Sequence, residues 1–383
     1  MRMEHRSALS VRFVLLAGCV LLGARANAQH YTQTNLVADE TGVAAVPDTH
    51  LVNPWGLSRS STSPWWVANN EDGTSTLYNT SANPPTIVPL VVTIQKAPGS
   101  TEDHGLPTGT VANGTSAFKL DNGNPARFLF VTEDGTVQGW NGGPAAAIKA
   151  FHKDAVYKGA AIASWRGTWF LYATNFAQGR VDVFDASFQD VHLADDGHDS
   201  AVSNHRGDDD HHRAFEDHQV PRGFSPFNVQ NIGGDLYVTY AKRDSATNDD
   251  VKGAGLGYVD VFSPGGRLLR RLEHGPWLNA PWGLAQAPGD FGAFSHDLLV
   301  GQFGSGEIAA YDPATGKFLG KLRDKATDAV LTIDGLWAIS FGNDASAGPL
   351  NTLFFSGGPD DESHGLFGSL TADPAEQLLG NGM

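Results

Sequence analysis

One sequence unit recurs six times along this chain and constrains its fold more than any other feature. In each copy an apolar segment ends in small or polar residues, a glycine follows, and a second segment alternates apolar with polar residues. Alternation with a period of two is typical of half-buried β-strands, and glycine suits a tight hairpin turn. The six copies lie at 65–78, 128–140, 170–184, 235–262, 297–311 and 352–370, with turn glycines Gly73, Gly135, Gly179, Gly257, Gly306 and Gly365.

A further strand is predicted before each hairpin, and a fourth after most of them. The preceding strands are expected at 53–58, 115–120, 159–164, 226–231, 280–286 and 334–340, and following strands at 86–92, 267–273 and 317–323. Four strands repeated six times predict an all-β protein, a six-bladed β-propeller over residues 29–371. Two stacked β-sandwiches are the alternative arrangement. One short helix is predicted, over residues 321–330.

The ring also needs a closing strand. The last copy has no fourth strand after Leu370, whereas residues 31–38 form a spare strand with the right alternation. We expect this N-terminal strand to pair with the last blade, because closure leaves no long strand edge exposed. Residues 372–383 are then a C-terminal tail.

The first 28 residues carry the features of a secretory signal peptide. Three arginines precede an apolar run over 13–23, and Ala26 and Ala28 fit the small-x-small pattern before a cleavage site. The run is too short to span a bilayer as a helix, and no later stretch is long and apolar enough. We therefore expect a secreted or periplasmic protein cleaved near Ala28. The alternative is a lipoprotein that carries its lipid on Cys19.

Composition excludes several classes of function. The 383 residues include 42 acidic and 26 basic residues, for a formal net charge of −16. A nucleic-acid-binding protein would carry a basic stripe, so we expect no nucleic-acid partner. Cys19 is the only cysteine, which leaves the exported chain without disulfides or a thiol nucleophile. The motifs of serine-hydrolase elbows, phosphate-binding loops and dinucleotide-binding folds are absent.

Several longer segments carry a family resemblance. They are NPWGL (53–57), VTEDGTVQGWN (131–141), GRVDVFD (179–185), PFNVQNIGGDLYVTYA (226–241), APWGLA (280–285) and HGLFGSL (364–370). Together they resemble a family of secreted bacterial six-bladed propellers known mainly as uncharacterised proteins. The blades are similar to NHL-repeat blades and, more distantly, to those of calcium-dependent lactonases. The resemblance covers about residues 30–371 and implies fold and export without implying an activity.

Polar residues collect at one predicted face of the ring. In each blade, the connections into the first strand and between the second and third strands open on the same face. The candidate ligand-binding residues there are Asn53, Asn69, Glu133, Asn175, Asn228, Asn279 and Asp334, with Asn70, Glu71, Asp72, Asp134, Asp360, Asp361 and Glu362 on the same connections. Carboxylate and amide oxygens suit Ca²⁺ or Mg²⁺, although Asp and Asn also form turns without any ligand.

These residues leave two main functions open. The first is a binding or scaffold module that presents its polar, acidic face to a small molecule, a glycan or an envelope protein. The alternative is a lactonase-like hydrolase, in which Ca²⁺ on the propeller axis polarises a carbonyl group. Glu133, Asn175 and Asp334 are the first candidates for its metal ligands. An axis plugged by apolar side chains would argue against the hydrolase. A structural, envelope-organising protein is a third possibility.

Three tryptophans belong to predicted first strands: Trp55, Trp282 and Trp337. Such side chains can stack on a sugar or an aromatic ligand. We expect them to pack between blades instead, where a large flat side chain fills the wedge.

The stretch 192–218 is rich in histidine and acids. It holds six His and eight Asp or Glu residues, among them Asp208, Asp210, His211 and His212. Imidazole and carboxylate ligands suit Zn²⁺, Ni²⁺ or Cu²⁺, but the irregular spacing fits no HExxH or EF-hand motif. We expect a solvated insertion between blades, with metal binding there adventitious.

Overall fold

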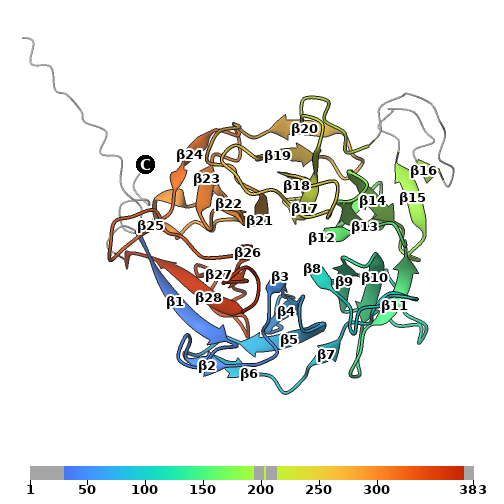
Figure 1. The fold of residues 1–383 in the computed structure, drawn as a ribbon, viewed down its shortest axis with the longest axis horizontal. Coiled ribbons are helices and arrows are strands. Elements are labelled where there is room, and N and C mark those ends of the chain that lie inside the picture. Colours follow the sequence, from blue (N-terminus) through green and yellow to red (C-terminus); the bar gives the residue numbers. More distant parts are fainter. Residues whose placement is uncertain (1–29, 194–201, 204–213, 375–383) are drawn as a thin grey trace, which may run out of the picture.

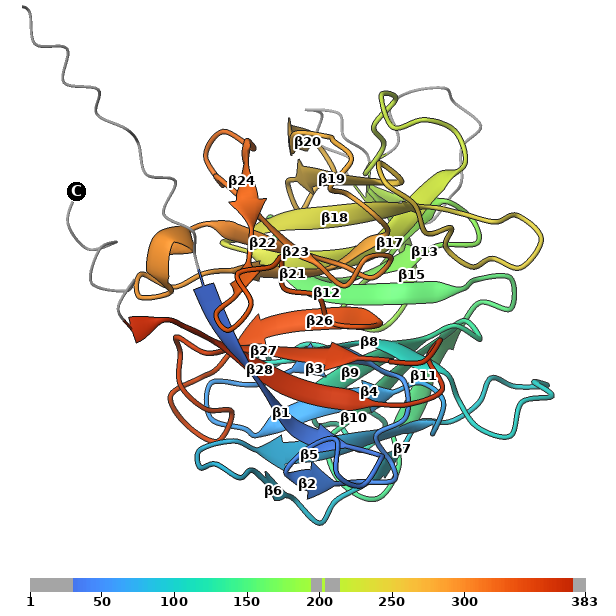
Figure 2. The same ribbon diagram turned by 60° about the vertical axis from the view of Figure 1, so that its left-hand side comes forward.

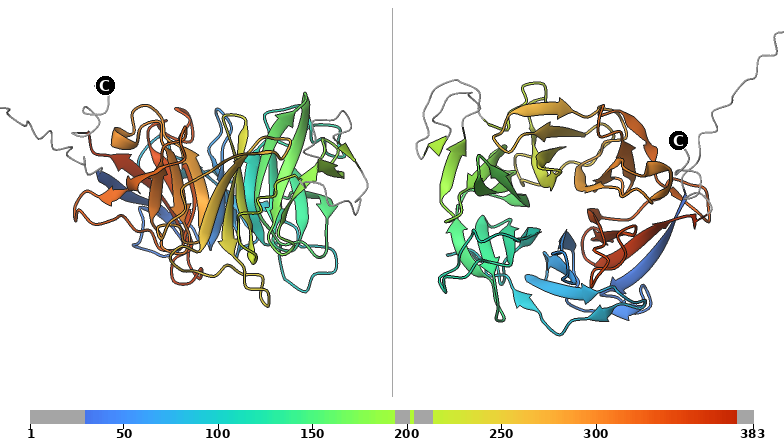
Figure 3. Two further views of the ribbon diagram at one scale, coloured as in Figure 1. Left: turned by 90° about the horizontal axis from the view of Figure 1, so that it is seen from above. Right: turned by 180° about the vertical axis from the view of Figure 1, so that it is seen from behind.

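The computed structural model describes residues 30–193, 202–203 and 214–374. Their strands form six sheets around a ring, which confirms the six-bladed β-propeller and excludes two stacked sandwiches (Figure 1). From the edge the ring is a thick disc (Figure 3). The expected signal peptide, Cys19 and the metal candidates Asp208, Asp210, His211 and His212 lie outside the described residues. Within the described residues, no helix has the length and apolar character needed to cross a bilayer.

Each blade is built around an antiparallel sheet whose first strand lies nearest the axis. Blade 1 contains β3 (Pro54–Ser58), β4 (Trp65–Asn69), β5 (Thr74–Asn79), β6 (Thr86–Ile87) and β7 (Val92–Thr93). Blade 2 contains β8 (Pro107–Ala112), β9 (Phe128–Thr132), β10 (Thr136–Trp140) and β11 (Ala147–Phe151). Blade 3 contains β12 (Tyr157–Trp165), β13 (Thr168–Asn175), β14 (Arg180–Phe184), β15 (Asp190–Leu193) and β16 (Val202–Ser203).

The second half of the ring follows the same plan. Blade 4 contains β17 (Phe224–Ile232), β18 (Asp235–Lys242), β19 (Gly257–Phe262) and β20 (Leu268–Arg271). Blade 5 contains β21 (Pro281–Gln286), β22 (Leu298–Gln302), β23 (Ile308–Tyr311) and β24 (Phe318–Lys321), with the 3₁₀ turn η1 (Gly292–Phe294) before β22. Blade 6 contains β26 (Leu336–Phe341), β27 (Leu353–Gly357), β28 (Leu366–Ala372) and β1 (His30–Ala38), which also pairs with β2 (Val46–Pro47) and β25 (Arg323–Asp324).

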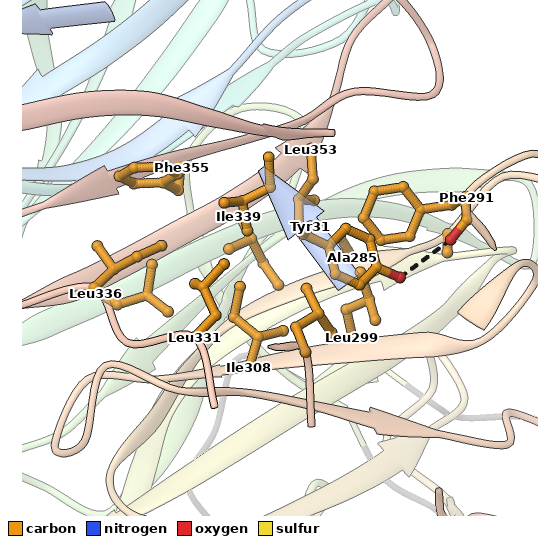
Figure 4. Close-up of a cluster of buried hydrophobic side chains, with 14 of the residues drawn as sticks. Tyr31, Ala285, Phe291, Leu299, Ile308, Leu331, Leu336, Ile339, Leu353 and Phe355 are labelled. Atoms are coloured by element: carbon orange, nitrogen blue, oxygen red, sulfur yellow. Dashed lines mark hydrogen bonds between the residues drawn. The ribbon is translucent and has the colours of Figure 1, made fainter. Parts of the chain in front are cut away.

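The N-terminal strand closes the ring, as expected. β1 runs antiparallel to β28, from the pair Tyr31–Ala372 to the pair Ala38–Leu366 (Figure 2). Tyr31 is fully buried and donates its hydroxyl to the backbone oxygen of Phe291 at 3.1 Å. Figure 4 shows Tyr31 among side chains of blades 5 and 6, including Leu299 and Ile339. The first strand therefore seals the boundary between the last two blades.

The prediction of a short helix over residues 321–330 was wrong. Residues 323–324 form the strand β25, and a turn follows. Asp324 accepts hydrogen bonds from the backbone N–H and hydroxyl of Thr327, both at 2.8 Å, and its carbonyl accepts from the N–H of Asp328. A side chain that bonds to its own neighbouring backbone favours a turn over a helix.

The first strand of blade 2 was also mispredicted. It is β8, residues 107–112, rather than 115–120. Inner strands pack so closely that a Cβ on Gly109 would lie 2.5 Å from the backbone nitrogen of Ala160. Small residues therefore occupy β8, and Thr108 donates its hydroxyl to the carbonyl of Tyr157 in blade 3 at 2.7 Å. Phe118 instead lies in the β8–β9 connection, with its ring 5.6 Å from that of Phe188.

Glycine is required at the six predicted turn positions for two different reasons. Four have the positive φ that a tight turn requires: Gly73, Gly135, Gly179 and Gly306. Gly257 and Gly365 do not belong to that group. A Cβ on Gly365 would lie 1.6 Å from the carbonyl oxygen of Leu51, and one on Gly257 would lie 2.3 Å from Cδ of Pro281. Close approach between blades explains these two glycines.

Candidate functional site

Six aromatic side chains fill the axis of the ring. Trp337 stacks on Trp55, with 3.4 Å between ring centroids, and on Phe303 at 3.8 Å. Trp282 meets Trp337 edge-on at 5.8 Å. The set is completely or almost completely buried and comprises Trp55, Phe176, Phe227, Trp282, Phe303 and Trp337. We call these residues the aromatic plug. The three tryptophans thus pack in the core, as expected, but they contact one another at the axis rather than filling separate wedges between blades.

A narrow cavity follows the axis beyond the plug, toward the carboxyl ends of the inner strands. Its lining combines small residues, such as Gly56, Gly109 and Ala338, with larger ones, such as Asn228 and Gln230. The empty volume is about 350 Å³ with open solvent included. All six inner strands line it.

On the other side of the plug, Lys158 forms the centre of a polar network. Its ammonium is 3% exposed and pairs with Oε1 of Glu133 in the β9–β10 connection. Asn70 of blade 1 donates its amide to Oε2 of the same carboxylate at 2.9 Å. The Lys158 Nζ also lies 4.9 Å from the centroid of Trp55. The ammonium thus sits on the aromatic plug, where a cation–π contact supplements the ion pair.

Glu362 joins the network from blade 6. Asn53 donates its amide to Oε2 of Glu362 at 2.8 Å, and Oδ1 of Asn53 accepts the indole N–H of Trp337 at 3.1 Å. Burial raises the pKa of Glu362 to about 7, assisted by the charge of Glu133 and opposed by the Asn53 hydrogen bond. Glu362 is the last of three successive left-handed residues, with φ of 53°, 52° and 70° from residue 360 onward. Such a run is costly for residues other than glycine.

Blade 4 adds Asp250 and Lys252 from the β18–β19 connection. Burial raises the pKa of Asp250 to about 6, although the charges of Lys158 and Lys252 lower it. The Asp250 Oδ2 is buried and accepts no hydrogen bond within the described chain. Lys252 lies with Nζ 4.4 Å from the ring centroid of Phe303. The connection is anchored at Gly253, whose N–H donates to Oδ1 of Asn279 at 2.6 Å.

We define the axial mouth as the set formed by these groups: Asn53, Asn70, Glu133, Lys158, Asp250, Lys252 and Glu362. Five blades contribute to it. Of the predicted ligand-binding residues, Asn53 and Glu133 belong to the mouth, and Asn279 anchors a connection that builds it. Its carboxylates, amides and ammonium can bind a polar group above a closed apolar floor.

Other predicted residues serve within or between blades. The amide of Asn69 donates to Thr76 at 3.0 Å, and the amide of Asn228 donates to the carbonyl of Trp282 at 2.8 Å. Asn175 donates to Asp182 at 2.7 Å, and exposed Asp334 accepts the N–H of Asp360 at 3.1 Å. The candidate calcium ligands Glu133, Asn175 and Asp334 therefore each have protein partners.

A different group brings potential metal ligands together. In the part of the chain that the structure describes, ligand atoms of Glu40, Asp360 and His364 lie within 4.8 Å of one another, and no such group includes Glu133 or Asp334. The group lies beside the closing strand, where Nδ1 of His364 contacts Asp39 at 2.8 Å. Both acids are exposed, as acids on a solvated surface commonly are.

Three residues of the mouth were not predicted from the sequence: Lys158, Asp250 and Lys252. Lys158 had a detectable signal, because it is the one charged residue in the otherwise apolar β12 segment YKGAAIA. Asp250 and Lys252 lie in a long polar connection over residues 243–256, where nothing in the sequence separates them from ordinary loop residues.

The fold and the site define a six-bladed β-propeller with a closed axis and a polar mouth. Comparison with known proteins identifies relatives of this chain by sequence. Over 353 residues the chain is 30% identical to the uncharacterized protein L690 of Acanthamoeba polyphaga mimivirus, covering 88% of this chain and 85% of that protein. It is 29% identical over 349 residues to the uncharacterized protein R648 of the same virus, covering 88% and 79%. The chain belongs to the family of these uncharacterized proteins, and no model of a known protein family matches it.

Solved structures with a similar backbone are remote in sequence. Streptogramin B lyase aligns with a TM-score of 0.48 and 10% identity, covering 90% of this chain and 98% of that one. An α-L-arabinofuranosidase of Fusarium graminearum aligns with a TM-score of 0.49 and 8% identity, covering 89% and 97%. Similarity at this level transfers no activity to this chain. The bacterial origin, the export and the NHL-like character expected from the sequence stay predictions, since the relatives reported above are viral proteins.

Proposed function

We propose that this protein is a binding module whose ligand contacts the axial mouth. The observation that carries the proposal is the convergence of Glu133, Asp250 and Glu362 around the buried ammonium of Lys158. These side chains come from four different blades, so the ring must close before they meet. Groups with strongly perturbed pKa values that gather in one place are typical of functional sites.

Stability alone does not require this arrangement. The aromatic plug already fills the axis with apolar side chains. A buried ion pair is often no more stabilising than well-packed apolar residues of similar volume, because both charges lose their hydration. A third and a fourth ionisable group, Asp250 and Glu362, add further desolvation. Such a cost is common where a protein recognises a ligand.

The calcium-dependent hydrolase expected as the alternative has less support. A Ca²⁺ ion on Glu133 would have to displace the Lys158 ammonium, which already neutralises that carboxylate. The aromatic plug also fills the axis where the ion was expected. One observation does favour catalysis: the pKa of Glu362, about 7, suits a general acid or base. Turnover of a lactone or phosphoester that disappears in Glu362→Gln would support this second candidate.

A thermal-shift screen tests the binding proposal. The purified protein and the Glu362→Gln variant are melted with a panel of cationic, neutral and anionic small molecules and oligosaccharides. A ligand at 100 times its Kd stabilises a protein by about 2.7 kcal/mol. We expect hits that raise the Tm of the wild type and not that of Glu362→Gln. Glu102→Gln, an exposed acid outside the mouth, is the matched control and should keep every hit. Hits unaffected by Glu362→Gln would contradict the proposal.

A further inference from the structure

Two ammonium groups of the chain itself lie on the aromatic plug. Lys158 Nζ lies 4.9 Å from the centroid of Trp55, and Lys252 Nζ lies 4.4 Å from that of Phe303. Trp55 and Phe303 both stack on Trp337, so the two lysines lie over one continuous aromatic cluster. The negative face of an aromatic ring attracts a cation, more strongly where water is excluded.

The two lysines are held very differently. Lys158 is buried in β12 and pairs with Glu133. Lys252 is exposed, and its ammonium makes no hydrogen bond or ion pair with another residue that the structure describes. The ring of Phe303 and the charge of Asp250 interact with this ammonium. An exposed lysine with so few contacts is displaceable, whereas Lys158 is a fixed part of the mouth.

We propose that the ligand of the axial mouth is an organic cation with an ammonium or guanidinium group. In the structure, the ammonium of Lys252 occupies the place that this group would take. This inference rests on the proposed function, because it names the class of ligand for the same site. The cation lies on the face of Phe303 beside Asp250 once Lys252 has moved aside.

An unused acceptor at this place supports the exchange. Asp250 Oδ2 is buried and accepts no hydrogen bond from any described residue, and Lys252 does not donate to it. A buried carboxylate oxygen without a donor costs free energy. An ammonium offers three donors and a guanidinium offers five. An external cation can therefore donate a hydrogen bond to Asp250 and also keep the cation–π contact. Lys252 makes only the second of these interactions.

The surrounding charges select against other ligand classes. The ionisable groups whose charges reach Asp250 or Glu362 are Glu133, Asp249, Lys158 and Lys252. With Asp250 and Glu362 ionised, carboxylates outnumber ammonium groups, so an anion is repelled. A neutral sugar that displaced Lys252 would leave the carboxylate of Asp250 without the charge of that lysine.

Proton release should accompany binding of the cation. Burial raises the pKa of Asp250 to about 6 and that of Glu362 to about 7, so both are partly protonated near neutral pH. A bound cation favours their ionised forms. Affinity should therefore rise as the pH increases from below the lower of these values to above the higher one.

Calorimetry with defined probes tests the inference. The probes are Nα-acetyl-lysine methylamide and Nα-acetyl-arginine methylamide, with Nα-acetyl-norleucine methylamide as the neutral control and CaCl₂ as the inorganic one. Lys252→Ala should bind the two cationic probes about tenfold more tightly than the wild type, because the internal competitor is gone. Lys317→Ala removes an equally charged lysine that is 70% exposed outside the mouth, and it should change nothing. Phe303→Leu in the Lys252→Ala background should abolish the gain.

The outcomes separate this inference from the proposed function. Equal binding of the norleucine probe, a gain for CaCl₂ alone, or no gain in Lys252→Ala would each overturn the cation assignment. If the thermal-shift screen still finds a neutral or anionic ligand that depends on Glu362, the mouth remains a binding site and only its ligand class is wrong. If no ligand depends on Glu362, the proposed function itself fails.

Discussion

Lys158 and Glu133 form an ion pair that joins blade 3 to blade 2 beside the aromatic plug. The lysine is buried, whereas the glutamate retains 20% side-chain exposure. Burial alone would lower the pKa of Lys158, yet the carboxylate of Glu133 raises it above the ordinary value. The Lys158 ammonium is therefore charged at neutral pH, and its burial is compensated by the Glu133 carboxylate.

Removing one partner of this pair should be strongly destabilising. Lys158→Met leaves the Glu133 carboxylate without its cation, and breaking a buried pair in this way costs about 3–5 kcal/mol. Urea unfolding measures the loss. The control is the pair Lys149–Asp121, whose aspartate is 91% exposed; Asp121→Asn there should cost less than about 1 kcal/mol. Equal losses in the two variants would show that the Lys158–Glu133 pair behaves as a surface pair.

Closure by the N-terminal strand should depend on the side chain of Tyr31. Tyr31→Phe removes the hydroxyl that donates to Phe291 and should cost about 1 kcal/mol of unfolding free energy. Tyr31→Ala also empties the space between blades 5 and 6, and cavities left by large aromatic residues cost about 3–5 kcal/mol. Urea unfolding of both variants checks this difference. If Tyr31→Ala matched Tyr31→Phe, β1 would not seal the ring through packing.

Asp182 should make the protein sensitive to acid. Although burial would raise its pKa, the imidazole of His152, whose Nδ1 lies 3.8 Å from Oδ2, and hydrogen bonds from Arg180 and Asn175 lower the pKa to about 2. A carboxylate whose pKa is lower in the folded state stabilises the fold above its unfolded pKa, and that stability is lost as the pH falls through the folded value. The contribution is about 2 kcal/mol at neutral pH. The stability difference between wild type and Asp182→Asn should therefore shrink between about pH 4 and pH 2. A difference that stays constant over this range would contradict the assignment.

Asp260 should have the opposite effect at higher pH. Burial and the neighbouring carboxylate of Asp217 raise the pKa of Asp260 to about 8. Asp217 itself stays ionised, because Arg271 donates to both of its oxygens. A raised folded pKa means that the contribution of protonated Asp260 is complete below about pH 4 and is lost as the pH rises toward 8.

The amide of Asp260→Asn cannot ionise, so this variant should not lose stability as the pH rises toward 8. Its unfolding free energy relative to wild type should rise between about pH 4 and pH 8, by an amount on the order of 5 kcal/mol. Unfolding in urea at several pH values measures the trend. Exposed Asp121→Asn is the control and should follow the wild type. A pH-independent difference for Asp260→Asn would mean that Asp260 is ionised in the folded protein.

The sequence predicted the architecture because a propeller repeats its local signals. Alternation, turn glycines and the spare strand at 31–38 each depend on neighbouring residues, and together they indicated the six blades and their closure. The errors arose where tertiary packing decides the structure. β8 carries Thr and Gly because the axis leaves no room, so no apolar pattern marked it.

The site was less predictable for the same reason. Asn53 and Glu362 are 309 residues apart in the chain, and only the closed ring brings them into contact. The expectation that certain connections of every blade open on one face placed both residues on the correct side. It also selected Asn69 and Asn175, whose amides form hydrogen bonds within their own blades. Lys158 precedes the strand predicted at 159–164 and lies outside the polar connections that supplied the other candidates, although the observed β12 begins at Tyr157 and includes it.

Hydrogen exchange tests most directly whether the axial mouth is the ligand-contacting surface. The protein is exchanged with and without a compound that stabilises it in the thermal-shift screen, and peptides are followed by mass spectrometry. We predict slower exchange in the connections 243–256 and 358–365, which carry Asp250, Lys252 and Glu362. Protection confined to the outer strands β20 and β24, with these two connections unchanged, would contradict the account.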